Sequence, residues 1–181
     1  MAFVKMNQGN YGGAMKMYEE CKAVQAEWAK VLGVNHPDYL TTLNNMASVK
    51  QKQGDYEGAM VLFEECKAGR AEVLSVKHPD YLITLNGMAS VKADQGDCDG
   101  AMVLYEECKA GRAEVLGVKH PYYLATLNNI ANVKADQGDY EGAMVLYEEC
   151  KVGQAEIKHP DYLGTLNNMA NIKGDQGDYE G

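Results

Sequence analysis

Apolar residues recur along this chain every three or four positions, the spacing that places them on one side of an α-helix. One such stretch follows Pro79 and carries Leu82, Leu85, Met88, Ala89 and Val91. A second follows Asp97 and carries Ala101, Met102, Leu104, Tyr105, Cys108 and Ala110. No alternating pattern of the kind typical of strands competes with this spacing. It therefore predicts two amphipathic helices, one from Pro79 to Gly96 and one from Asp97 to about Leu116.

The residues at the ends of these two stretches support the same boundaries. Proline suits a first helical turn, where its missing N–H would have no partner in the helix, so Pro79 marks a start. Gly96 accepts the left-handed conformation that ends helices. Asp97 is a favourable N-cap for the helix that follows.

The helix pair recurs along the whole chain. His-Pro occurs four times, and in each case the next Gln-Gly follows 17 residues later. The tetrapeptide Gln-Gly-Asp-Tyr, or a close variant, occurs at intervals of 45, 42, 42 and 39 residues, beginning at Gln8, Gln53, Gln95, Gln137 and Gln176. The length differences come in steps of three residues, close to one helical turn, so the second helix of a pair changes length without rotating its apolar face far.

This period predicts an all-α fold, an α-solenoid of antiparallel helix pairs. We expect one array over residues 1–181, which begins and ends within a repeat and is typical of a piece of a longer array. Its expected repeats are a partial one at 1–35, full ones at 36–77, 78–119 and 120–158, and a partial one at 159–181.

Three segments of one repeat carry a specific resemblance. Thr-Leu-Asn-Asn-Met-Ala at 42–47, Gln-Gly-Asp-Tyr-Glu-Gly-Ala at 53–59 and Leu-Phe-Glu-Glu at 62–65 resemble the tetratricopeptide repeat. The 42-residue period and the His-Pro-Asp opening resemble the kinesin light chain type of that repeat.

The resemblance implies a right-handed superhelix in which small residues of the first helix of each pair meet small residues of the second. The first-helix residues would be Ala47, Ala89, Ala131 and Ala170, and the second-helix residues Ala14, Ala59, Ala101 and Ala143. It also implies a second-helix aromatic, matched by Tyr18, Phe63, Tyr105 and Tyr147. The chain departs from the family by placing glycine within the second helices, at Gly58, Gly100 and Gly142, at about 0.5–1 kcal/mol each relative to alanine.

Composition narrows the function classes. The chain has 17 Lys and Arg against 26 Asp and Glu, a net charge of −9, which disfavours nucleic acid as a partner. It has no apolar run as long as the ~18–20 residues of a membrane span, and no secretory signal follows Met1. Five cysteines without an export signal favour free thiols in a reducing, cytoplasmic location.

The cysteines and histidines are candidates for chemistry, but each group has a simpler interpretation. Cys21, Cys66, Cys108 and Cys150 share one repeat position and are expected to be buried packing groups, whereas Cys98 is expected to be partly exposed. The four His-Pro histidines lack the short ligand spacing of zinc sites and are interpreted as loop residues at helix starts.

Three aspartates are candidates for a calcium site, but a role in helix capping explains them better. Asp94, Asp97 and Asp99 begin like a calcium loop without its closing glutamate, so helix-end capping is favoured. The sequence predicts no catalytic residues, metal or cofactor, and it contains no nucleophile elbow, no phosphate-cradling glycine loop and no paired-histidine zinc motif. An enzyme built from the Cys and His rows is the least favoured alternative.

A polar row on the first helices is the candidate binding surface. The resemblance implies that it lines a concave groove, and amides can both donate to and accept from a peptide backbone. The alternative is that these side chains bond neighbouring first helices and only stabilise the stack. The row comprises Asn44, Asn45, Ser48, Asn86, Ser90, Asn128, Asn129, Asn132, Asn167, Asn168 and Asn171.

A lysine row lies near the polar row and is a candidate for attracting an acidic ligand. It comprises Lys50, Lys52, Lys92 and Lys134. Asp94 and Asp136 each follow a lysine by two residues and are expected to cancel its charge, whereas Lys50 with Lys52 escapes this cancellation.

We therefore expect a protein-interaction scaffold that binds a peptide or partner helix in the groove. The alternative is a structural spacer segment with no groove ligand. We also expect the array ends to self-associate, because Leu163, Leu166, Met169 and Ile172 at one end, and the helix around Trp28 at the other, would lack a covering helix.

Overall fold

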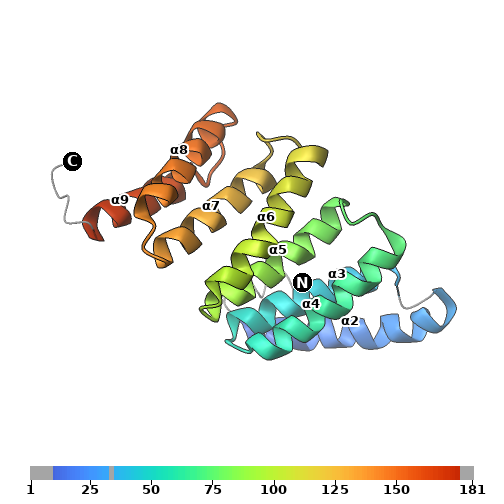
Figure 1. The fold of residues 1–181 in the computed structure, drawn as a ribbon. Coiled ribbons are helices and arrows are strands. Elements are labelled where there is room, and N and C mark those ends of the chain that lie inside the picture. The colour runs from blue at the N-terminus through green and yellow to red at the C-terminus, as the bar shows by residue number, and fades with distance from the viewer. Residues whose placement is uncertain (1–9, 33–34, 176–181) are drawn as a thin grey trace. The chain divides into compact units, whose positions relative to one another are not determined.

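The computed structural model describes residues 10–32 and 35–175, so residues 1–9 and 176–181 of the two expected partial repeats lie outside the described range. The described part of the chain forms eight helices and no strand (Figure 1). The first helices of the pairs are α3 (Pro37–Lys52), α5 (Pro79–Asp94), α7 (Pro121–Asp136) and α9 (Tyr162–Asp175). The second helices are α2 (Tyr11–Leu32), α4 (Tyr56–Val73), α6 (Cys98–Val115) and α8 (Tyr140–Glu156). The predicted all-α fold of helix pairs is confirmed.

The turn between the helices of a pair explains why the Gln-Gly-Asp sequence recurs. Gly54, Gly96 and Gly138 have φ angles of 79°, 80° and 81°, in the left-handed region that glycine adopts without strain. The next residue, an aspartate, is the N-cap of the following helix. A glycine stop and an aspartate start therefore lie side by side in each pair.

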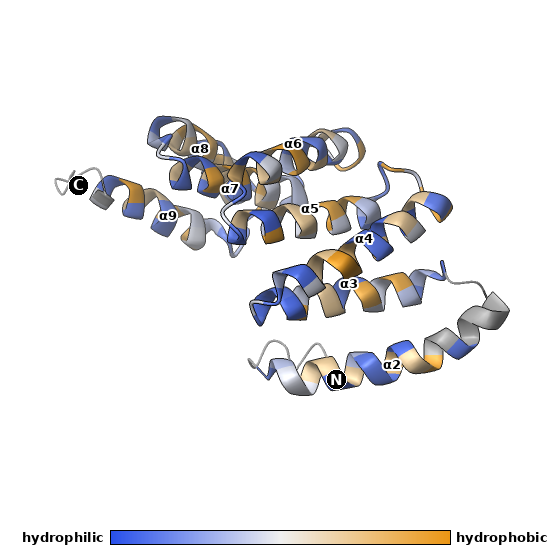
Figure 2. Cartoon of the chain, turned by 60° about the horizontal axis from the view of Figure 1, so that its bottom comes forward, coloured by the Kyte–Doolittle hydropathy of each residue, from blue (hydrophilic) through white to orange (hydrophobic). Residues whose placement is uncertain are grey.

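The chain divides into two compact units, Met1–Val91 and Lys92–Gly181. In the first unit α3 packs against α2 and α4, and its core includes Ala47, Ala59 and Phe63. In the second unit α7 packs against α6 and α8, and α8 packs against α9. Hydrophobic and hydrophilic residues alternate along the described helices, as the banded colouring of Figure 2 shows.

The core of the second unit contains the small and aromatic residues that the family resemblance implied. Ala131 on α7 and Ala143 on α8 are fully buried in one cluster with Tyr147. Met169 and Ile172 on α9 pack into the same cluster. Ala170 is an exception, because it is exposed on α9. Of the apolar residues expected to lie open on this helix, Leu163 is 68% exposed, whereas Met169 and Ile172 are buried. The Trp28 side chain lies outside the described positions.

The glycines flagged within the second helices lie in fact in the first helical turn. The N–H of Gly58, Gly100 and Gly142 donates in each case to the side chain of the N-cap aspartate three residues earlier, at 2.9 Å. A Cβ at any of these positions would collide with that carboxyl group. Glycine is therefore placed where the cap needs close approach, and not where helix propensity alone decides.

Candidate functional site

In the first unit, several polar side chains of the expected row bond within the protein. Asn44 is 9% exposed, and its Oδ1 accepts a hydrogen bond from Thr84 Oγ1 on α5 at 3.2 Å. Ser48 Oγ donates to the Asn44 carbonyl at 3.1 Å. Ser90 Oγ lies 2.8 Å from its donor, Gln51 Nε2 on α3. The Asn44 and Ser90 bonds join α3 to α5, as the stacking alternative requires, whereas the Ser48 bond lies within α3.

In the second unit, the row again supplies bonds between helices. Asn128 Oδ1 on α7 lies 3.3 Å from the Thr165 hydroxyl on α9. Asn132 Oδ1 accepts from the Tyr147 hydroxyl and, at 3.2 Å, from Asn168 Nδ2. Burial raises the pKa of the Tyr147 hydroxyl to about 12, so this group remains a donor at neutral pH.

The remaining asparagines of the row differ in whether their side chains already have partners within the protein. Asn86 is half-buried and already interacts within the protein. Asn45 and Asn129 are half-buried, and Asn167 and Asn171 are exposed. Among the described residues, none hydrogen-bonds to the side chains of these last four asparagines. Their amides therefore remain available to a partner.

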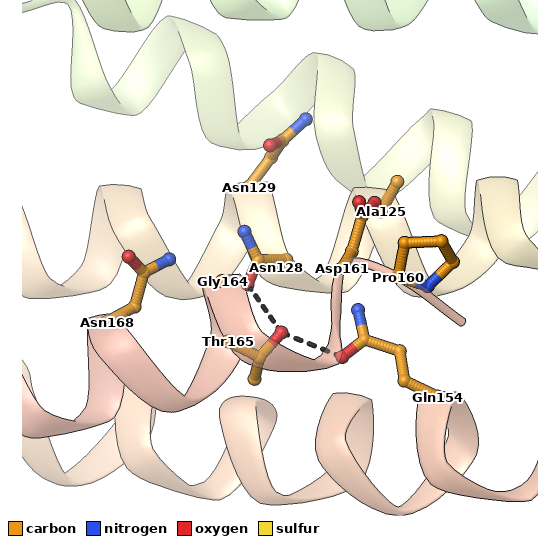
Figure 3. Close-up of a pocket in the computed structure, with 9 residues that line it drawn as sticks. All are labelled: Ala125, Asn128, Asn129, Gln154, Pro160, Asp161, Gly164, Thr165 and Asn168. Carbon is orange, nitrogen blue, oxygen red and sulfur yellow. Dashed lines mark hydrogen bonds between the residues drawn. The ribbon is translucent and has the colours of Figure 1, made fainter. Parts of the chain in front are cut away.

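Two hollows lie between α7 and α9, on the side that carries the asparagines, and Figure 3 shows the first of them. It has a volume of about 330 Å³ and is lined by Ala125, Asn128, Asn129, Gln154, Pro160, Asp161, Gly164, Thr165 and Asn168. The second, of about 400 Å³, is lined by Asn132, Ala135, Asp136, Tyr147, Asn168, Asn171 and Ile172. Asn168 lines both hollows. The structure thus brings five asparagines of the expected row to one polar depression.

Sequence reasoning missed a buried arginine at the same position of two second helices. Arg70 and Arg112 are each 4% exposed. Arg112 Nη1 donates to the Tyr122 carbonyl at 2.7 Å and to Thr126 Oγ1 at 2.6 Å, and burial lowers the pKa of its guanidinium. Arg70 makes the equivalent pair of bonds to α5. The guanidinium therefore ties a second helix to the first turn of the next helix.

A signal for these arginines was present in the sequence. Cys-Lys-Ala-Gly-Arg occurs at 66–70 and at 108–112, and Cys-Lys-Val-Gly-Gln occurs at 150–154. A charged residue in register with a buried cysteine, on a helix face that is otherwise apolar, indicates a buried polar contact.

The lysines of the expected electrostatic row are ion-paired, but not with the predicted partners. Lys92 Nζ lies 2.5 Å from Asp97 Oδ2, and Lys134 Nζ lies 2.6 Å from Asp139 Oδ2. Residues two apart on a helix do not face each other, whereas the turn brings the N-cap aspartate back to the lysine. Lys50 pairs with Asp55 in the same way, so the expectation that it escapes compensation was wrong. Lys52 is exposed.

These pairs predict a specific dependence on acid. Hydrogen bonds from the lysine and from the glycine N–H hold the pKa of Asp55, Asp97 and Asp139 below the ordinary value of 3.8. Their contribution to stability is therefore complete above pH 3.8 and is lost as the pH falls through the lower folded-state pKa. In thermal melts below pH 4, the wild type should lose melting temperature more steeply than a variant with asparagine at all three positions. Equal slopes would contradict this.

The histidines have a structural role at the start of each first helix. His36 Nδ1 accepts from the Asp38 N–H at 3.3 Å, and His120 Nδ1 accepts from the Tyr122 N–H at 3.1 Å. His78 and His159 make the same bond, each at 3.2 Å. The interpretation as loop residues at helix starts is confirmed, and His36 and His120 are the N-caps of α3 and α7.

Three of the four repeat cysteines are buried as expected, and one is not. Cys66, Cys108 and Cys150 are fully buried, Cys98 is partly exposed, and Cys21 is exposed. Cys66 is covered on both sides, since its Sγ donates to the Leu40 carbonyl of α3 and lies 3.4 Å from Thr84 Oγ1 of α5. In the described part of the chain, α2 packs only against α3, so Cys21 lacks this second cover and its predicted burial was wrong.

The cysteines should therefore differ in reactivity. Burial raises the pKa of the Cys66 and Cys108 thiols, and that of Cys150 to about 12, so little thiolate forms at neutral pH. We expect Cys21 and Cys98 to react with iodoacetamide in the native protein and the three buried cysteines to react only in denaturant, as read by mass spectrometry of the peptides. Native labelling of Cys66, Cys108 or Cys150 at the rate of Cys21 would contradict this.

The described helices carry neither the features of a membrane span nor those of a metal site. Within residues 10–32 and 35–175, no helix combines the length and the apolar character needed to cross a bilayer. No group of three or more His, Cys, Asp or Glu in these ranges is arranged to hold a metal ion. Asp97, from the calcium-like sequence, acts as the N-cap of α6.

Known structures share this fold. One is a kinesin light chain-type protein from Podosopora anserina, whose own TPR-like repeats are nearly identical to one another. Its sequence is 26% identical to this chain, with a TM-score of 0.77 over 99% of this chain and 85% of that one. BtubC from P. vanneervenii is 16% identical, with a TM-score of 0.78 over 99% and 71%. Rap protein complexed with competence and sporulation factor is 13% identical, with a TM-score of 0.83 over 99% and 48%. No curated protein matches.

A family model decides the assignment. The model described as tetratricopeptide repeat matches three overlapping stretches, residues 1–72, 38–112 and 80–151. These cover most of the chain and follow the repeats described above. The chain therefore belongs to the tetratricopeptide repeat family, and its repeats are similar to those of kinesin light chain-like proteins.

Proposed function

We propose that this chain is a protein-interaction module that binds an extended peptide segment of a partner along the first helices, with α7 and α9 forming the contact. Tetratricopeptide repeats are a family of protein-interaction scaffolds and not of enzymes. The observation that carries the proposal is the polar depression between α7 and α9, bordered by five asparagines.

The chemistry of this depression suits a peptide backbone. Asn129 and Asn171 line it without using their amides inside the described structure. A free amide supplies both a donor and an acceptor, which match the C=O and N–H of a peptide whatever its side chains are. The array of full repeats at 36–77, 78–119 and 120–158, flanked by partial ones, would present such positions at regular intervals.

The lysines contribute less to this proposal. Lys50, Lys92 and Lys134 are neutralised by the N-cap aspartates, so a strongly acidic ligand is not favoured over a neutral one. We also propose a cytoplasmic protein partner, without nucleic acid, since the net charge of −9 repels a phosphate backbone.

The structural spacer is the second candidate, and a specific observation favours it. Asn44, Asn128 and Asn132 all bond neighbouring helices, so part of the row serves the stack whether or not a ligand binds. The two candidates differ at Asn129, because its amide makes no bond that the stack would lose.

Peptides selected by phage display on the wild type test the proposal. Substituting Asn129→Ala should weaken the selected peptides by about 2–10-fold, the effect of one hydrogen bond, without changing the melting temperature. The matched control is Val145→Ala, which shortens a side chain that is 64% exposed on α8 and should leave affinity unchanged. Failure to select any peptide, or equal affinity of the Asn129 variant, would favour the spacer.

A further inference from the structure

The position occupied by a buried arginine in two repeats holds a shorter, neutral residue in the third. Gln154 on α8 is in register with Arg70 and Arg112 and is 2% exposed. Arg112 reaches two acceptors on the next element, whereas Gln154 makes one bond, between its Oε1 and the Thr165 hydroxyl at 2.8 Å. The pocket of about 330 Å³ lies at this place. Its size is at the lower end of the ~300–1,000 Å³ range of ligand sites.

The shorter side chain leaves a buried donor without a partner. Gln154 makes no second hydrogen bond within the described residues, and in Figure 3 its Nε2 points away from Thr165 towards the side of the pocket near Asp161. A buried donor left without a partner destabilises the free protein, so a ligand acceptor that satisfies it is favoured. Asn128, on the opposite wall, uses only its Oδ1 within the described residues, so its Nδ2 is also available to a ligand. Two amide donors thus border one pocket.

A negative charge at the pocket limits which ligand groups could accept hydrogen bonds from these two donors. Asp161 carries the one charged side chain among the nine lining residues. Its carboxylate repels a ligand carboxylate and accepts from a ligand N–H. An ammonium or guanidinium group would suit Asp161 but would offer only donors to Gln154 and Asn128. A primary amide offers a carbonyl to the donors and an N–H to the carboxylate.

We infer that this pocket takes the side-chain amide of a glutamine or asparagine from the bound peptide, so that Gln154 is a specificity-determining residue. The inference rests on the proposed function, because it assigns one pocket of the same peptide-binding surface. It adds a preference at a single peptide position to binding that is otherwise directed at the backbone.

Four capped heptapeptides test the inference. They share Gly, Ser and Ala at the six flanking positions and carry Gln, Glu, Lys or Leu at the centre. NMR titration, following the Gln154 side-chain amide signals and the backbone signals of α7 and α9, gives a dissociation constant for each. We expect the Gln peptide to bind at least tenfold more tightly than the Leu and Glu peptides and to shift the Gln154 amide signals.

Gln154→Arg is the matched variant, since the chain carries arginine at this position in two other repeats. The new side chain should fill the pocket and hold α9 as Arg112 holds α7, so helicity is retained. We expect this variant to bind all four peptides with similar affinity. Gln154→Glu is the second variant, because it keeps an acceptor for Thr165 but removes the donor, and it should lose the preference for Gln.

The outcomes separate the two claims. Equal binding of all four peptides by the wild type, with shifts along α7 and α9, would overturn the inference and leave the proposed function intact. Retention of the Gln preference in both variants would also overturn the inference. The absence of any shift along α7 and α9 with every peptide would overturn both claims.

Discussion

Replacing Arg112 with alanine is expected to lower the free energy of unfolding by about 2–4 kcal/mol, a large loss for a single side chain. The guanidinium is 4% exposed and donates to the Tyr122 carbonyl and to Thr126 Oγ1. Hydrogen bonds from a charged donor contribute about 1.5–3 kcal/mol, and removing the long side chain also leaves a cavity. The guanidinium also lies 5.4 Å from the Tyr122 ring centroid, which adds a cation–π contact.

Urea unfolding followed by circular dichroism measures this loss. Arg112→Gln is the matched control, because glutamine occupies the equivalent buried position at residue 154 and bonds the equivalent threonine, Thr165. It should cost about half as much. An alanine variant as stable as the wild type would show that the arginine is only tolerated in the interior and does not hold the helices together.

Replacing Gly87 with alanine is expected to destabilise the protein by about 1–2 kcal/mol, although alanine is the better helix former. A Cβ at Gly87 on α5 would lie 2.5 Å from Cζ of Phe63, a ring on α4 that is 1% exposed and would have to shift within the core. The steric cost of about 1–3 kcal/mol outweighs the ~1 kcal/mol gained in helix propensity.

Gly164→Ala is the matched control, with the opposite expected sign. Gly164 lies in the first turn of α9. Apart from its two chain neighbours and the backbone of its own helix, no heavy atom lies within 4 Å of a Cβ built there. The same substitution should therefore raise stability by up to about 1 kcal/mol. Urea unfolding of both variants gives the comparison, and two changes of the same sign would contradict it.

Gly87 also shows why the repeat pattern has an exception. It occupies the place of Asn45, Asn129 and Asn168 in the polar row, and the aromatic that faces it is Phe63, where the other repeats have tyrosine. A ring whose tip comes this close to the helix backbone needs glycine opposite it. Sequence alone shows the two exceptions separately, and only the packing joins them.

The helices could be predicted because the residues that start and stop them agree with the repeat period. The predicted pair of 79–96 and 97–116 is observed as Pro79–Asp94 and Cys98–Val115, within two residues at every end. The proline start, the glycine stop and the aspartate cap act within one or two turns of their own position, so no knowledge of the surrounding fold is needed.

The features that escaped prediction depend on residues distant in the chain. Cys21 and Cys66 share one repeat position, but the burial of Cys66 requires helices on both sides. The pocket at Gln154 exists only because the next first helix places Asp161 and Thr165 beside it. Position within the repeat therefore predicts which side of a helix a residue occupies, but not what covers it.

Hydrogen–deuterium exchange of the chain with and without a display-selected peptide tests the central claim most directly, because it locates the peptide on the molecule. The account predicts slower exchange in α7 and α9, residues 121–136 and 162–175, and unchanged exchange in the segments of α6 and α8 around the exposed Val103 and Val145. Protection confined to α6 and α8, with α7 and α9 unchanged, would place the binding surface on the second helices and contradict the account.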